Sequence, residues 1–287
     1  MSKIVFGGAQ IPVTDNINDN VNNISKAIEW AADNQVDYLL TPEGSLSGYI
    51  PIFNETVSFE EIRSALDQVV DLAASKNVGL ILGTKIKDEE DLVYNQLRVY
   101  DKAGVFQGAH DKMYGLPEYD RAVPPIETRV IDLVHEGKTI KILGLLCNDF
   151  WGHVDLAAKP LPEIAKVDNA HVIMHSSNGF RGFGLSTEDV LYEYHNAVVR
   201  LYSQTLRKPI LTVDNCWFMH GQPYEGRTSS RSGAIHHGEW LTEEKNTGTE
   251  YFKLELDLDK LLSREYEKDK DLEIKQRMGI QSVKNSV

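Results

Sequence analysis

Two residues of the sequence stand where a side chain could take part in covalent chemistry. Cys147 ends the apolar run in KILGLLCNDFWG, where a buried strand gives way to Asn148, Asp149 and two aromatic residues. Glu43 holds a comparable place in YLLTPEGSLSGY, just past another apolar strand. Functional residues gather at strand ends in α/β proteins. A thiol there becomes a nucleophile when a base takes its proton and a cation lowers its pKa, and the carboxylate of Glu43 could be that base.

Each residue also has an ordinary interpretation. A lone cysteine in an apolar run is most often a buried structural residue. A lone glutamate after a strand, such as Glu43, is most often solvated. Lys112, in the loop sequence GAHDKMYGLPEYD, would by itself be a surface charge, and Glu118 follows it six residues later. Residue types taken singly therefore leave the function open. The order of these residues and the sequence around them are needed to choose between the two interpretations.

Short apolar runs alternate with helical patterns along the whole chain. Strands are predicted over residues 4–9, 38–40, 78–84, 92–100, 130–134, 140–147, 170–174, 210–214, 229–236 and 251–258. Helices are predicted over residues 16–34, 59–75, about 155–167 and up to about 207, and Ser58 with Glu61 indicates a cap for the second helix. Aperiodic loops are predicted over 110–127 and 175–186. The alternation indicates a layered α/β fold with a mixed sheet or two packed sheets.

Composition excludes several classes of protein. The chain has 287 residues, 41% hydrophobic and 25% charged, which is typical of globular proteins. A formal net charge of −13 makes a nucleic acid an unlikely partner, because a polyanion would be repelled. Apolar runs are too short for a membrane span and the N-terminal residues do not resemble a signal peptide, so we expect a cytoplasmic protein whose two cysteines are thiols.

A single domain is expected over 1–287, with a core to about 262 and a charged tail over 263–287.

The order of three segments carries a family resemblance. TPEGSLSGY, HDKMYGLPEYD and LGLLCNDFWG resemble, in this order, the signature segments of the nitrilase superfamily of carbon–nitrogen hydrolases. The resemblance covers nearly the whole chain and implies a four-layer α-β-β-α sandwich. It implies Glu43 as the general base, Lys112 as the cation beside a developing oxyanion and Cys147 as the nucleophile. Glu118 matches the additional glutamate of that family, which positions substrate, and no metal or cofactor is implied.

The resemblance also indicates where substrate would bind. In this family the residues just after the nucleophile line the pocket, which implies Asn148, Asp149 and Trp151 as substrate-positioning residues, with Tyr49 contributing to an aromatic wall. The sequence CND also begins the matching segment of N-carbamoyl-D-amino-acid hydrolases. The next residues, FWG, replace the arginines and the acidic residue of that group, which puts the binding of a substrate carboxylate in doubt.

The predicted function is cleavage of a non-peptide C–N bond in a small amide or N-carbamoyl compound through a cysteine thioester, releasing ammonia or an amine. Nitrile hydrolysis is the alternative within the family, and a non-catalytic scaffold that retains the fold is the alternative outside it. A papain-like hydrolase would need a histidine partner for Cys147. The resemblance further implies a homodimer or a higher homo-oligomer.

Two histidines lie four residues apart, a spacing that would suit a metal site on a helix, but metal binding is not expected here. His171 and His175 lie four residues apart in a segment that favours a strand. In a strand this spacing is about 13 Å, which is too far for two ligands of one zinc ion.

Overall fold

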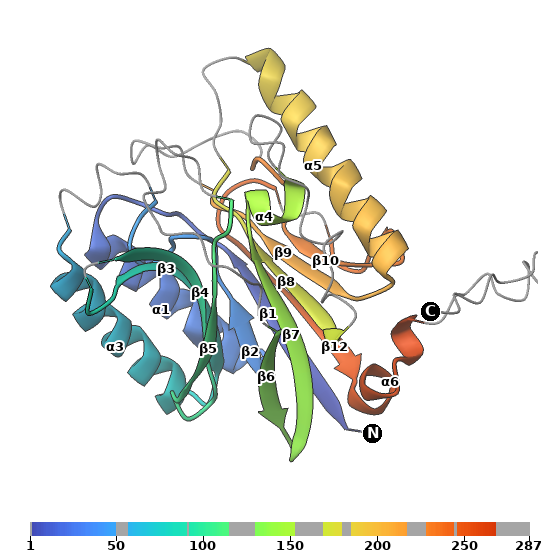
Figure 1. Cartoon of the computed structure of the whole chain (residues 1–287), viewed down its shortest axis with the longest axis horizontal. Coiled ribbons are helices and arrows are strands. Elements are labelled where there is room, and N and C mark those ends of the chain that lie inside the picture. The colour runs from blue at the N-terminus through green and yellow to red at the C-terminus, as the bar shows by residue number, and fades with distance from the viewer. Residues whose placement is uncertain are drawn as a thin grey trace, which may run out of the picture.

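The protein is a sandwich of two six-stranded sheets with helices on both outer faces (Figure 1). A computed structural model describes residues 2–49, 57–90, 92–114, 130–152, 169–179, 185–216, 228–243 and 246–267. Helices α1 (Ile17–Asp33) and α3 (Phe59–Ser75) cover one sheet, and α5 (Leu185–Leu206) covers the other. The predicted α-β-β-α sandwich is therefore confirmed, and two packed sheets are present rather than one mixed sheet.

The first sheet has the strand order β12-β1-β2-β3-β4-β5. Its strands are β1 (Lys3–Gln10), β2 (Tyr38–Leu40), β3 (Gly79–Lys87), β4 (Val93–Tyr100), β5 (Phe106–Asp111) and β12 (Glu250–Asp257). The pairs β1–β2 and β2–β3 are parallel, and the other pairs are antiparallel. The loop predicted from residue 110 begins later, because His110 and Asp111 still pair with Leu97 and Gln96 of β4.

The second sheet has the strand order β11-β10-β9-β8-β7-β6. Its strands are β6 (Val130–His135), β7 (Lys138–Leu146), β8 (Val172–Ser176), β9 (Ile210–Val213), β10 (Gly233–His236) and β11 (Glu239–Trp240). Strands β7, β8 and β9 are parallel. The prediction of a strand over 229–236 was wrong at its start, because Ser229 and Ser230 leave the ladder to bind the carboxylate of Asp214.

The helices begin where the sequence carries caps. The predicted capping box is confirmed, since Ser58 accepts from the N–H of Glu61 and the Glu61 carboxylate accepts from the N–H of Ser58. The remaining short helices are α4 (Asn148–Trp151), α6 (Leu258–Leu262) and a 3₁₀ turn at Glu265–Glu267. The helix predicted over about 155–167 and most of the predicted tail over 263–287 lie outside the described residues. Among the helices that the structure describes, none combines the length and the apolar character that a membrane span requires.

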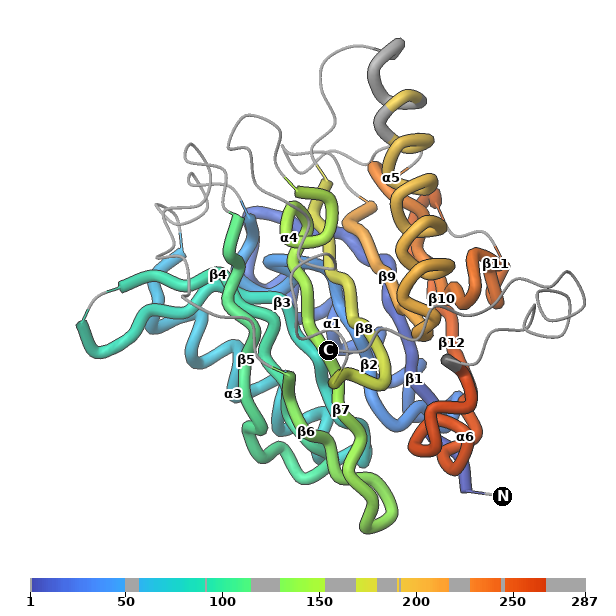
Figure 2. The backbone as a smooth tube through the Cα atoms, turned by 45° about the vertical axis from the view of Figure 1, so that its right-hand side comes forward, coloured from blue at the N-terminus to red at the C-terminus, as the bar shows by residue number. Residues whose placement is uncertain are grey.

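Three apolar layers hold the sandwich together, and Figure 2 shows α3 on one side of the strands and α5 on the other. The middle layer contains Leu40 and Leu97 from the first sheet and Ile142 and Met174 from the second, all fully buried. Close packing of this kind resists sliding. The middle layer therefore fixes how the strand ends of one sheet face those of the other.

A tight contact ties β3 to the turn over residues 41–47. The hydroxyl of Ser45 and the N–H of Leu46 both donate to the carbonyl of Gly83, at 3.1 and 3.2 Å. A Cβ atom at Gly83 would lie 2.1 Å from the carbonyl oxygen of Pro42 and 2.8 Å from the Cα of Glu43. Only glycine at this position lets the turn approach the strand.

Gly83→Ala should therefore destabilise the protein. Both atoms that the new methyl group meets belong to backbone, and overpacking of this kind typically costs about 1–3 kcal/mol. The measurement is the free energy of unfolding in urea. Gly7→Ala is the control, because the atoms nearest its Cβ belong to the side chains of Val36 and Leu39 and not to backbone. An equal loss of stability in both variants would contradict the prediction.

Candidate active site

Glu43 is held in the turn that follows β2. The N–H of Thr41 continues the ladder by donating to Ile81, and the hydroxyls of Thr41 and Ser45 bond across the turn at 2.8 Å. The side chain of Glu43 is fully buried. The ordinary interpretation of a solvated loop glutamate therefore does not fit this residue.

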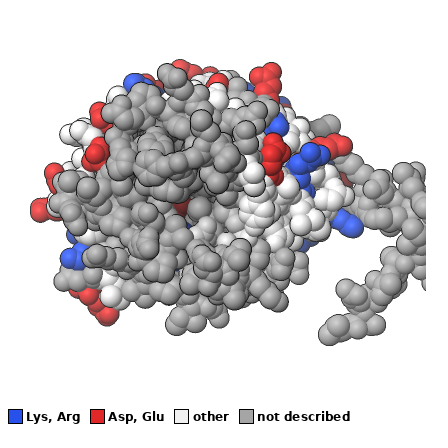
Figure 3. Space-filling view, turned by 90° about the horizontal axis from the view of Figure 1, so that it is seen from above, with Lys and Arg blue, Asp and Glu red and all other residues white. Residues whose placement is uncertain are grey.

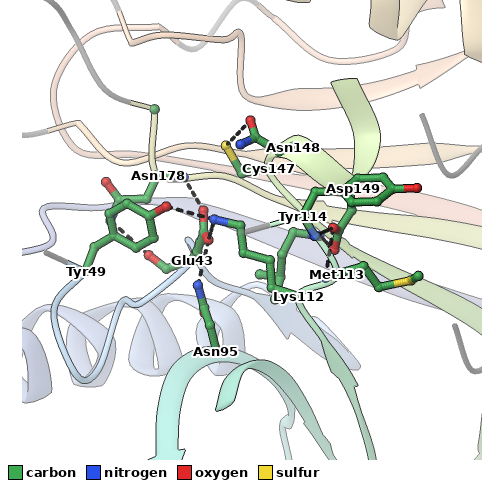
Figure 4. A network of polar contacts seen from close by, with 12 residues as sticks. Glu43, Tyr49, Asn95, Lys112, Met113, Tyr114, Cys147, Asn148, Asp149 and Asn178 are labelled. Atoms are coloured by element: carbon green, nitrogen blue, oxygen red, sulfur yellow. Dashed lines mark hydrogen bonds and ion pairs between the residues drawn. The ribbon is translucent and has the colours of Figure 1, made fainter. Parts of the chain in front are cut away.

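Lys112 directly follows β5 and forms a buried ion pair with Glu43 (Figure 4). Its N–H donates to the carbonyl of Asn95 at 2.8 Å, which extends the pairing of β4 with β5 by one residue. Its Nζ lies 2.7 Å from Oε1 of Glu43, and both side chains are 0% exposed. Removing one partner of such a pair leaves an uncompensated buried charge, which is strongly destabilising.

Polar groups from several elements surround this pair. Nδ2 of Asn95 donates to Oε1 of Glu43 at 2.8 Å. The N–H of Asn178 donates to Oε2 at 3.2 Å, and its side-chain amide donates to the Glu43 carbonyl at 3.0 Å. The hydroxyl of Tyr49 accepts from Nζ of Lys112 at 2.8 Å, and the Tyr49 ring centroid lies 4.9 Å from the same nitrogen. Carboxylate and ammonium are thus oriented from more than one side.

The sequence analysis gave neither asparagine a role. Asn178 follows β8 much as Glu43 follows β2, so the rule that drew attention to strand ends applies to it as well. Asn95 lies inside β4, and the pair Tyr94-Asn95 belongs to the family resemblance, although no role was predicted for it.

Cys147 occupies a strained position between β7 and α4. Its backbone has φ 42° and ψ −104°, and its N–H donates to the carbonyl of Ser176 at 2.9 Å. A positive φ is unfavourable for a residue with a side chain, and such strain concentrates at functional sites. The sulfur lies 3.8 Å from Oδ1 of Asn148, and Figure 4 shows Cys147 beside Glu43 and Lys112. The structure therefore brings the three predicted catalytic residues together.

The thiol of Cys147 is protonated in this environment. Burial is the main cause that raises its pKa, to about 12, and the negative charges of Glu43 and Asp214 act in the same direction. Lys112 and the hydroxyl of Ser177 oppose them. Because the thiolate is disfavoured at neutral pH, attack by this sulfur requires a base that takes its proton as it reacts.

Asp149 links the turn after β7, which contains Cys147, to the segment that carries Lys112. Its carboxylate is fully buried, and Oδ1 accepts from the N–H groups of Met113 and Tyr114 at 3.0 and 2.8 Å. Oδ2 lies 3.0 Å from Nε2 of His110 and accepts from the N–H of Leu146 at 3.3 Å. These contacts give Asp149 a positioning role, and they do not support the predicted contact with substrate.

Trp151 is packed in the core rather than in an open wall. Its ring stacks on His195 at 4.3 Å and meets the ring of His175 edge-on at 4.6 Å. Burial lowers the pKa of His175 to about 3, so this ring stays neutral, and its Nδ1 lies 2.8 Å from the hydroxyl of Thr212. These contacts make His175 a packing residue of β8.

Two further expectations concern the surroundings of the site. Glu118 lies outside the described residues. Within the described ranges, no group of three or more His, Cys, Asp or Glu side chains is arranged to hold a metal ion.

Figure 3 looks onto the end of the sandwich where α4 lies, and acidic and basic side chains both appear around its margin.

Comparison with known proteins identifies the family. The sequence model of the carbon-nitrogen hydrolase family matches residues 6–151, just over half of the chain, and this segment contains Glu43, Lys112 and Cys147. The chain therefore belongs to the carbon-nitrogen hydrolases. A search of curated protein sequences gave no significant match.

Solved structures with the same fold include the amidase from Nesterenkonia sp. AN1. One structure of it has a TM-score of 0.69 at 17% identity, and the alignment covers 96% of this chain and 99% of that one. A double mutant of the same amidase in complex with acrylamide has a TM-score of 0.70 at 17% identity, with 97% and 98% covered. At this identity the likeness establishes the fold.

Two substitutions should move the pKa of the Cys147 thiol in opposite directions. Glu43→Gln should lower this pKa, because the carboxylate disfavours the thiolate, and Lys112→Met should raise it, because the ammonium favours the thiolate. The measurement is the pH dependence of Cys147 alkylation by iodoacetamide, followed by mass spectrometry. All variants carry Cys216→Ala, which leaves one thiol as reporter. Shifts of the same sign in both variants, each shown by its melting curve to be folded, would refute this picture of the site.

Asp149→Ala should lower the free energy of unfolding strongly. It leaves the N–H groups of Met113 and Tyr114 without their acceptor, and each buried donor left unsatisfied costs about 1–3 kcal/mol. Urea denaturation measures the loss. The control is Asp132→Ala, which breaks the exposed pair with Lys141 and should cost about 1 kcal/mol or less. Equal losses in the two variants would speak against a structural tie at Asp149.

Proposed function

We propose that this protein is a thiol amidase that cleaves the C–N bond of a small amide or N-carbamoyl compound. The observation that carries the proposal is the fully buried Glu43–Lys112 pair beside the strained Cys147, in a chain of the carbon-nitrogen hydrolase family. A base, a cation and a nucleophile in one buried site are the three groups that acyl transfer needs.

In the first half of the reaction, the sulfur of Cys147 attacks the carbonyl carbon and its proton passes to Glu43. The negative charge moves to the carbonyl oxygen, where the ammonium of Lys112 and the backbone N–H of Asn148 stabilise it. The C–N bond then breaks, and Glu43 returns the proton to the departing nitrogen. The products of this half are a thioester on Cys147 and free ammonia or amine.

In the second half, Glu43 takes a proton from a water molecule that attacks the thioester carbon. The same two donors stabilise the second oxyanion. The C–S bond breaks, the acid leaves, and the proton on Glu43 returns to the sulfur. This sequence restores the protonated thiol that the raised pKa of Cys147 favours.

Short aliphatic amides are the first substrate class to test. The Nesterenkonia amidase, which shares the fold, has been solved with acrylamide and with butyramide. In this chain, Tyr49 lies against Lys112 and Asn148 lies against the sulfur, and these contacts support the proposal that both residues touch the acyl group. Trp151 acts behind them as packing, and substrate contacts by Glu118 stay a prediction.

The predicted homodimer is a further part of the proposal. Helix α5 exposes Val190, Tyr194 and Leu201, which are 68%, 46% and 57% accessible and recur at helical spacing. Exposed apolar residues on one helix face are typical of surfaces that a second subunit covers. We infer that α5 is the face through which two copies pair.

The test of the proposed activity is ammonia release from a panel of amides, N-carbamoyl compounds and nitriles. The wild type should release ammonia from at least one compound, and short amides such as butyramide are expected first. Cys147→Ala should release none from any compound while it keeps the wild-type melting temperature. A covalent adduct on Cys147, detected by mass spectrometry after rapid quenching, should appear in the wild type with the same substrate.

Two outcomes would decide against the proposal. No release from any compound, together with a Cys147 that does not react with iodoacetamide, would favour a non-catalytic scaffold. Release that persists in Cys147→Ala would exclude the thioester route.

A further inference from the structure

Ser177 lies between the two halves of the proposed site, in a position that the reaction above does not use. It directly follows β8, and its N–H donates to the carbonyl of Val213 at 2.9 Å. The residue before it, Ser176, accepts the N–H of Cys147, and the residue after it, Asn178, donates to Glu43. The backbone around Ser177 is therefore fixed from both sides.

Strand register sets Ser177 next to Cys147. In the parallel pair β7–β8, Leu146 lies opposite Ser176, so the residues that follow on the two strands are Cys147 and Ser177. Ser177 is fully buried. Within the described part of the chain, its hydroxyl oxygen has no hydrogen-bond partner of normal geometry.

A buried hydroxyl without a partner needs an explanation. Leaving such a group unpaired destabilises a fold, and native proteins retain the arrangement chiefly where it serves a function. The neighbour that could use this donor is the sulfur of Cys147. A neutral thiol is a weak acceptor, whereas a thiolate is a strong one.

We propose that Ser177 is a further catalytic residue, whose hydroxyl donates a hydrogen bond to the sulfur of Cys147 when the thiol proton has left. This proposal rests on the proposed function of Cys147 as nucleophile. The hydroxyl keeps its own proton throughout, because Glu43 receives the thiol proton. The bond weakens when the C–S bond forms and the charge moves to the carbonyl oxygen, and it returns when the thioester breaks.

The charges around the sulfur explain why such a donor is useful. Glu43 and Asp214 disfavour the thiolate, and Lys112, whose Nζ is 2.7 Å from Glu43, is partly neutralised by that carboxylate. A neutral donor favours the thiolate without a further charge in the buried site. The effect of the Ser177 hydroxyl on the pKa of Cys147 has this sign, since it lowers that pKa.

The experiment compares Ser177→Ala with the wild type in a Cys216→Ala background. Iodoacetamide is the probe, and the rate of Cys147 alkylation is followed from pH 6 to pH 10 by mass spectrometry. Because hydrogen bonds to charged groups are the strong ones, the alkylation rate should fall about tenfold or more. The pKa of Cys147 lies above the pH range used, so the fall should be by the same factor at every pH. The melting temperature should stay the same or increase, because an unpaired buried hydroxyl has been removed.

Matched variants separate this role from a structural one. Ser203, on α5, is also a fully buried serine, but its oxygen accepts from the N–H of Gly238, in the turn between β10 and β11. Ser203→Ala should lower the melting temperature and leave the alkylation profile unchanged. Ser177→Thr, which keeps the hydroxyl, should retain most of the wild-type rate.

Unchanged alkylation rates in Ser177→Ala would overturn the proposal, and so would a Ser177→Thr variant that alkylates as slowly as Ser177→Ala. If Ser177→Ala fails to fold, wild-type alkylation rates from pH 6 to pH 10 in Ser177→Thr support the proposal, and rates about tenfold lower over that range overturn it. Alkylation needs no amide substrate. Failure of the wild type to hydrolyse any amide is therefore a separate result from failure of the Ser177 donor.

Discussion

The buried pair of Glu43 and Lys112 is the interaction on which the rest of the site depends. Neither side chain has any contact with solvent, so the protein must supply the stabilisation that water would give two full charges. Asn95, Asn178 and Tyr49 do so by direct hydrogen bonds. A pair held in this way fixes the carboxylate near Cys147, whose pKa it raises.

The groups around this pair come from both sheets. Glu43, Lys112 and Asn95 belong to the first sheet or follow its strands, whereas Cys147, Ser177 and Asn178 follow strands of the second. The packed layer between the sheets sets the distance between the two groups. Asp149 adds a direct tie, since its carboxylate joins the turn after β7 to the backbone after β5. The relative positions of the side chains in the site therefore depend on how the core packs.

Sequence reasoning predicted much of the fold because its signals are local. Alternating patterns located most strands, and Ser58 with Glu61 marked the start of α3. The sequence analysis placed the start of β10 too early. Ser229 and Ser230 donate hydrogen bonds to the carboxylate of Asp214, which is not adjacent to them in the sequence. The residues of the site also fall into those that local sequence predicted and those that it did not. Cys147, Glu43 and Lys112 stood in recognisable segments, whereas Asn95, Asn178 and the tie at Asp149 depend on which strands become neighbours, which no short segment encodes.

The strand order of the first sheet determines how much of the chain must be synthesised before the site can form. All three predicted catalytic residues have been synthesised by residue 147, but β1 pairs with β12 along residues 250–257, near the end of the chain. Domains generally fold as units while the chain leaves the ribosome from its N-terminal end. During synthesis the thiol of Cys147 is therefore that of an ordinary unfolded cysteine, with no buried carboxylate beside it. A chain interrupted before β12 would contain Glu43, Lys112 and Cys147 but would lack the edge strand that pairs with β1 along its whole length.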